Sequence, residues 1–208
     1  MKVILLRLRP VFAAISVSVL AACSLTPREE ARWVDLSVAS RPGVLQGQKV
    51  LVACDAYDAA VRQLCQDALY REVLAKGGNP VVLPPGASFT TDRELDGQLV
   101  ASAGALDAKA VFVMTLTPIA TNAGSGLSLG IGGFSFGRGG GAGIGLSAPL
   151  GGSQPGLELA ANGRVTEVSS SRLIWTASFV SSGSQSLEAQ AASLSRSMLD
   201  AAKSSGIF

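Results

Sequence analysis

Apolar and polar positions alternate in blocks from residue 48 onward, and the blocks predict strands and helices in turn. The apolar run 49–54 predicts a strand buried on both faces. Asp55 and Asp58 then offer helix caps, and the apolar residues that follow recur at helical spacing up to Gly77-Gly78, which predicts a helix that ends there. The same patterns predict a strand at 80–84, a helix at 91–106 and a strand at 109–116.

The second half of the chain predicts a hairpin and a closing helix. Segments 157–168 and 172–182 have strand character and flank the serine turn 169–171, while a last amphipathic helix begins near Ser186. We expect Trp175 to point inward and to pack against this helix near Leu194 and Met198. The predicted fold is α/β (with an α+β variant): a single mixed β-sheet with packed helices, in the order β-α-β-α-β, a Gly-rich β-hairpin insert, β-β, α.

The insert, residues 122–156, contains 14 of the 24 glycines, and Arg138 is its only charged residue. Apolar residues alternate with Gly and Ser in both of its arms, which predicts a β-hairpin with one apolar face. Three covers for that face remain open: the host domain, another subunit, or lipid. Insertion into lipid would need a closed ring of several chains, because a lone hairpin leaves backbone groups unpaired.

The first residues predict an export signal and a lipid anchor. Residues 1–22 carry a basic start and a short apolar run, typical of a secretory signal peptide. The run ends in Leu-Ala-Ala-Cys, which resembles the bacterial lipobox, so Cys23 is the expected lipidation site. Ser24 follows rather than Asp, which by the usual sorting rule favours the outer membrane. We expect 23–47 to be a lipidated tether that contains one short strand or turn at 33–36, and 48–208 to be a single domain.

Composition removes several function classes. Hydrophobic residues make up 48% of the chain and charged residues 15%, which suits a folded core. Without the signal peptide, 14 basic residues face 15 acidic ones, so the chain has no electrostatic footprint for nucleic acid. The chain contains no histidine, which excludes imidazole as a base or a metal ligand. No Ser-x-x-Lys string is present either.

The remaining candidate groups predict structure rather than chemistry. The carboxylates Asp55, Asp58, Glu94 and Asp96 sit where helices start, which favours capping. The Gly-rich string 137–142 lacks the strand and helix that a phosphate-binding loop needs. We therefore expect no catalytic residues, no cofactor, no metal and no small-molecule substrate.

Two further cysteines leave two alternatives open. In an oxidising periplasm, Cys54 and Cys65 would form a disulfide between the first strand and the next helix. Bridged Cα atoms lie within about 7 Å, whereas a helix axis packs about 10 Å from its sheet, so the alternative is two buried thiols. The ten residues between them do not match the Cys-x-x-Cys motif of an oxidoreductase.

Together, the lipobox, the early strand–helix–strand and the late hairpin, which reads Arg-Val-Thr-Glu-Val and then Arg-Leu-Ile-Trp-Thr-Ala, resemble a set of bacterial envelope lipoproteins. These share the α/β fold of the CsgG, LpoB and TolB amino-terminal-domain type. The resemblance implies an envelope role by binding and assembly, and it carries no catalytic residues.

The leading hypothesis is an outer-membrane lipoprotein, anchored through Cys23 with its domain in the periplasm. It would be a non-enzymatic binding and assembly factor for another envelope protein or its own copies. The alternative is a subunit of an oligomeric outer-membrane pore or secretion complex that uses the 122–156 hairpin. The third hypothesis, an enzyme or small-molecule binder of the cell wall, has no convergent acid, base or nucleophile to support it.

Overall fold

A six-stranded mixed sheet organises the chain, with strand order β1-β6-β5-β4-β2-β3. The computed structural model describes residues 26–83, 95–119, 157–181 and 186–208. β2, β3 and β4 run parallel to one another, and the remaining neighbours pair antiparallel. The strands are β1 (Arg28–Val34), β2 (Lys49–Ala56), β3 (Asn79–Val81), β4 (Ala110–Ile119), β5 (Glu158–Glu167) and β6 (Arg172–Val180). The helices are α1 (Leu36–Ala39), α2 (Ala59–Ala75), α3 (Leu95–Ala105) and α4 (Leu187–Ser204).

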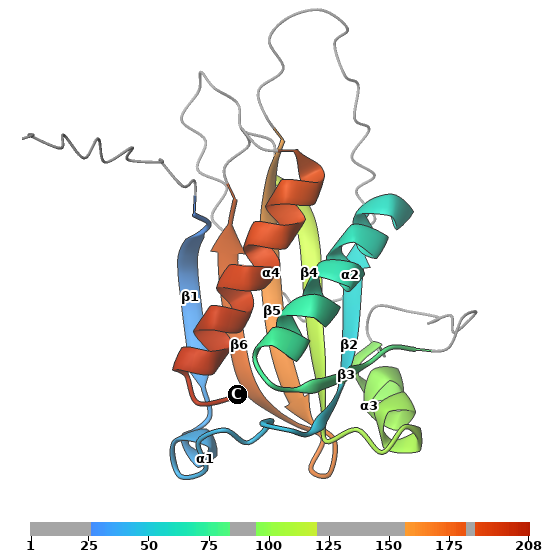
Figure 1. Ribbon diagram of the computed structural model, residues 1–208, viewed down its shortest axis with the longest axis vertical. Coiled ribbons are helices and arrows are strands. Elements are labelled where there is room, and N and C mark those ends of the chain that lie inside the picture. The colour runs from blue at the N-terminus through green and yellow to red at the C-terminus, as the bar shows by residue number, and fades with distance from the viewer. Residues whose placement is uncertain (1–25, 84–94, 120–156, 182–185) are drawn as a thin grey trace, which may run out of the picture.

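The predicted α/β class and the predicted element order are confirmed over the described residues. α2 and α4 lie side by side on one face of the sheet, and α3 packs on the other face over β2 and β4 (Figure 1). The predicted hairpin at 122–156 and the first residues of the helix predicted at 91–106, up to residue 94, lie outside the described residues.

Local signals in the sequence set the ends of the two long helices. The Asp58 carboxylate accepts hydrogen bonds from the Ala60 and Val61 amides, and the Ser186 hydroxyl caps α4 in the same way. Beyond α2, Gly77 adopts a φ of +90°, the left-handed conformation that glycine tolerates best, and the chain turns into β3. These three predictions are confirmed.

The expected tether 23–47 is wrong for most of its length. Residues 28–34 form β1, which pairs antiparallel with β6 at the edge of the sheet. Val38 and Leu45 are buried in the core, and the Leu45 amide donates to the Ile207 carbonyl. The domain therefore begins at Arg28 rather than at residue 48. The sequence predicts only a short strand or turn at 33–36, because the side chains of β1 are mostly charged and exposed and its main chain supplies the pairing.

Arg32 ties β1 to the helix layer. Its guanidinium donates to the Ser204 hydroxyl at 2.7 Å and to the Ala201 carbonyl at 3.3 Å, both in the last turn of α4. A second edge of the same group pairs with Glu29 at 2.9 and 2.6 Å. A cation at this position complements the negative end of the helix dipole.

Trp175 lies in the middle of the main core, with none of its surface exposed. Its ring centroid is 5.8 Å from that of Phe112 on β4. The indole Nε1 donates to the Ser205 hydroxyl at 3.1 Å, just beyond the end of α4. The predicted inward position is thus confirmed, with the polar contact made at the end of the closing helix. Met198 lies over Gly163, where a β-carbon would collide with it.

We predict that Trp175→Ala lowers the free energy of unfolding by about 3–5 kcal/mol, because it removes a large buried ring and its hydrogen bond. The matched control is Trp33→Ala, since 46% of the Trp33 surface is exposed. Urea denaturation followed by circular dichroism measures both changes. Equal losses in the two variants would contradict the assignment of Trp175 to the core.

Candidate binding face

The side of the sheet opposite α2 and α4 is the main candidate for a functional surface. Among the described elements, only α3 packs on this side, where it covers Leu51, Val111 and Val113. We call the remainder of this side, over β1, β6, β5 and the carboxyl-terminal ends of β4 and β2, the open face. Successive residues of a strand point to opposite faces, so the strand register fixes which side chains belong to it.

The strand register places the side chains on this side of the sheet in rows that run across the strands. The central row contains Trp33, Thr176 and Arg164 on the open face, and it continues beneath α3 to Val113 and Ala53. The next row contains Ala31, Ser178, Asn162, Thr115 and Asp55. In these two rows the open face therefore combines small and hydroxyl side chains with one amide, one cation, one carboxylate and one half-exposed indole.

Internal hydrogen bonds hold the centre of the open face in place. The Ser178 hydroxyl donates to the Asn162 side-chain oxygen at 2.6 Å, and the Thr176 hydroxyl donates to the Gly163 carbonyl at 2.9 Å. These groups are fixed on rigid strands, which suits binding better than a mobile loop would. Trp33 supplies the large, half-exposed aromatic surface that protein interfaces favour.

The two sheet edges are poorly suited to pairing with another strand. β3 has only three residues and contains Pro80, which has no amide proton to donate. β1 carries a bulge between Glu29 and Ala31 and a series of charged side chains. Short, bulged and charged edges disfavour strand addition. The open face is therefore a better interaction surface than either edge.

The carboxylates that the sequence singled out do not converge. Asp58 caps α2, Asp55 lies on the open face and Asp96 lies in α3, while Glu94 is outside the described residues. Across the described ranges, no group of three or more His, Cys, Asp or Glu residues could hold a metal ion. None of the described helices is long and apolar enough to span a bilayer.

Two ionisable groups have shifted pKa values, and both have structural causes. Hydrogen bonds from Ser37 hold the pKa of the Asp35 carboxyl below its usual value, with the positive charge of Arg172 acting in the same direction. Burial raises the pKa of the Tyr57 hydroxyl, and the neighbouring charge of Asp58 adds to the effect. Asp35 caps α1 and Tyr57 precedes α2, so neither shift indicates an acid–base pair.

A shallow groove crosses the helix layer between α2 and the start of α4. It is open to solvent and carries Asp67, Arg71 and Glu188 at its walls beside Tyr70. Asp67 accepts a hydrogen bond from Gln63 at 2.9 Å, so it already has a partner within α2. The groove presents mixed charges without the enclosed, largely apolar shape of a small-molecule site.

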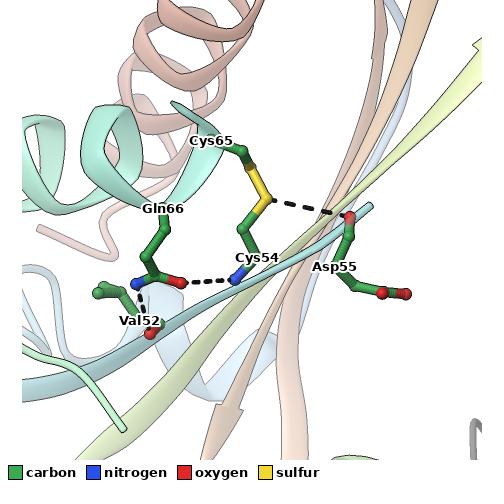
Figure 2. The surroundings of a disulfide bond; sticks show 5 residues. All are labelled: Val52, Cys54, Asp55, Cys65 and Gln66. Atoms are coloured by element: carbon green, nitrogen blue, oxygen red, sulfur yellow. Dashed lines mark hydrogen bonds between the residues drawn. A yellow bond between two sulfur atoms is a disulfide. The ribbon is translucent and has the colours of Figure 1, made fainter. Parts of the chain in front are cut away.

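Cys54 and Cys65 form a disulfide that joins β2 to α2, with their Cα atoms 5.9 Å apart (Figure 2). Of the two alternatives that the sequence left open, the structure contains the bridge. Cys54 lies near the carboxyl end of β2, where the chain turns toward the helix, so the two backbones are still close enough for bridging.

Gln66, the residue after Cys65, was missed by the sequence analysis. Its side-chain oxygen accepts from the Cys54 amide and its nitrogen donates to the Val52 carbonyl, both at 2.9 Å (Figure 2). β3 pairs with β2 only as far as Leu51, so on the side away from β4 the next backbone groups of β2 have no strand beside them among the described residues. Gln66 takes the place of that missing strand, a role that only the tertiary fold reveals.

No family model and no curated protein matches the chain. Among solved structures, it is similar to the PelC dodecamer from Paraburkholderia phytofirmans, with 11% identity, a TM-score of 0.51, and coverage of 86% of this chain and 96% of that one. A variant of that PelC dodecamer aligns with 12% identity, a TM-score of 0.50, and coverage of 85% and 96%. The LpoB C-terminal domain from Salmonella enterica aligns with 12% identity, a TM-score of 0.40, and coverage of 70% and 90%. The similarity to PelC shows a shared fold.

We predict that the double variant Cys54→Ala with Cys65→Ala loses about 3 kcal/mol of unfolding free energy, because opening a short loop increases the freedom of the unfolded chain. Thermal melting with and without a thiol reductant provides the measurement. The reductant should destabilise the unmodified protein and leave the double variant unchanged. A reductant that shifts neither protein would show that the bridge contributes no stability.

Proposed function

We propose that this chain is an outer-membrane lipoprotein, anchored through Cys23, whose periplasmic domain binds and assembles envelope proteins without catalysis. The observation that carries the proposal is the open face, a rigid surface of strand side chains beside the exposed indole of Trp33. The lipobox at the end of the signal peptide supports the anchor. The disulfide between Cys54 and Cys65 is consistent with an oxidising compartment.

Binding accounts for the available groups better than catalysis does. The whole chain lacks histidine, so a general base would have to be a carboxylate, a lysine or a tyrosine. Asp58 caps α2 and Glu72 lies between Lys76 and Arg196, so these carboxylates have structural partners. On the open face, the Ser178 hydroxyl donates to Asn162 and the Thr176 hydroxyl to the Gly163 carbonyl, so these groups hold the surface in shape.

A second candidate partner is another copy of the same chain. It is favoured by the similarity of the fold to PelC, a protein whose solved structure is a dodecamer. In that case the open face or its rim would contact a neighbouring subunit, and the chain would form part of an oligomeric pore or secretion complex. A role for residues 122–156 in such a complex stays a prediction.

We predict that Cys23→Ser leaves the protein in the periplasm as an uncleaved precursor or a soluble form, because acylation needs the thiol. Fractionation of the envelope, followed by immunoblotting of each fraction, measures the change. Substitution of the neighbouring Ser24 by Ala is the matched control and should preserve outer-membrane localisation. A Cys23→Ser protein that still fractionates with the outer membrane would contradict the anchor.

We predict that a photocrosslinking amino acid at Trp33 captures a protein partner in intact cells, because this position adjoins the proposed binding surface. The control is the same amino acid at Leu74, which is 56% exposed but lies on α2, on the opposite side of the sheet. Adducts are identified by mass spectrometry. Crosslinks from Leu74 alone would contradict binding through the open face.

The identity of the adduct separates the two candidates. Capture of a different envelope protein from position 33 favours an assembly factor. Capture of the same chain favours self-association, and the mass of the extracted complex then gives the number of copies.

A further inference from the structure

One end of the sheet brings together the ends of four strands, β1, β6, β5 and β4, from distant parts of the sequence. Arg28 at the start of β1 pairs with Val180 at the end of β6, and Val180 also pairs with Ala160 near the start of β5. Ala160 in turn pairs with Thr117, near the end of β4. We call this edge, with the adjoining Leu157, the anchor end. In Figure 1, β1 begins at this end, and the C-terminus lies at the opposite one.

The predicted lipid anchor is very close to the anchor end. Cys23 precedes Arg28 by five residues, and five residues of fully extended chain span at most about 18 Å. A 25-residue tether would allow the domain to lie far from the bilayer and to adopt any orientation. The observed start of β1 removes most of that freedom.

The attachment point is also rigid. β1 is paired with β6 over its length, and Arg32 binds the last turn of α4, so the chain from Arg28 onward moves with the domain. On the opposite side of the anchor end, the Leu157 carbonyl accepts a hydrogen bond from the Gln190 side chain at 2.9 Å. The Ser181 hydroxyl donates to the same Gln190 at 2.6 Å, which fixes the end of β6 to the start of α4.

We propose that the anchor end faces the lipid surface, and that the short tether holds the strands upright on the membrane with the turn 169–171 pointing away from it. This inference rests on lipidation at Cys23 as proposed above. The exposed apolar groups at this end suit an interface, since Tyr57 is 49% exposed and Leu157 is 37% exposed. The acidic residues Glu158 and Glu188 lie nearby, so the tether rather than charge attraction provides the contact.

An upright domain gives the open face a definite direction. Because the strands stand perpendicular to the membrane, the open face is also perpendicular to it. Its side chains therefore point parallel to the membrane plane rather than into the periplasm. Partners of the open face are therefore proteins that stand beside the domain at the same membrane surface.

The test measures how far each end of β5 lies from lipid. Leu157→Cys and Ser169→Cys place a single free thiol at the two ends of this strand, since Cys23 is acylated and Cys54 is bridged to Cys65. Both positions are exposed, and they are about 35 Å apart along the strand. The full-length acylated protein, labelled with a fluorescent donor, is reconstituted in phosphatidylcholine vesicles that contain an acceptor on the lipid headgroup.

We predict that energy transfer to the headgroup acceptor is several-fold more efficient from position 157 than from position 169. Equal transfer from the two positions, or stronger transfer from position 169, would overturn the proposed orientation. Circular dichroism checks that each variant is folded, and Arg28→Cys provides a second label at the anchor end. Its side chain is 78% exposed.

A longer tether tests the cause. Inserting about 30 Gly and Ser residues between Thr26 and Pro27 gives a flexible linker with a mean span of about 30 Å, so the difference between the two labels should disappear. A difference that persists would overturn the tether as the cause of the orientation. Mass spectrometry separates this inference from the proposed function. An unacylated Cys23 refutes the anchor itself, whereas an acylated, vesicle-bound protein with equal transfer refutes only the orientation.

Discussion

The packing of α2 and α4 against one face of the sheet is the constraint on which the rest of the structure depends. Phe112 and Trp175 fill the space between the strands and these helices, and an ion cluster links the helices to each other. In that cluster, Lys76 bonds Asp200 at 2.5 Å, and Glu72 lies 3.4 Å from Arg196. Since both long helices cover the same face, the opposite face keeps only α3 among the described elements, and polar strand residues are left at the surface.

The amino-terminal strand contributes side chains to both faces of the sheet. β1 contributes little apolar surface, so its stability comes from backbone pairing with β6 and from the Arg32 contacts at the end of α4. The same strand places Trp33 on the open face. Under the proposed function, lipid anchoring and partner binding would share this one element.

Most of the fold could be predicted from the sequence because β2, α2, β4, β5, β6 and α4 have strong periodicity and clear caps. β1 could not, because Arg-Glu-Glu-Ala-Arg-Trp-Val has no apolar alternation, and an edge strand exposed on both faces needs none. The residues that make up the open face could not be predicted from the sequence either. Its rows depend on strand register, including a bulge between Val165 and Thr166, and register is fixed by contacts between residues far apart in the sequence.

The end of the chain is part of the core. Ile207 and Phe208 are buried, and the Gly206 and Ile207 carbonyls accept hydrogen bonds from the Gly43 and Leu45 amides at 2.7 and 2.8 Å. The amino-terminal and carboxyl-terminal segments of the domain therefore pack together and share backbone hydrogen bonds. Because these hydrogen bonds join residues about 160 positions apart, forming this part of the core carries the entropic cost of closing a long loop.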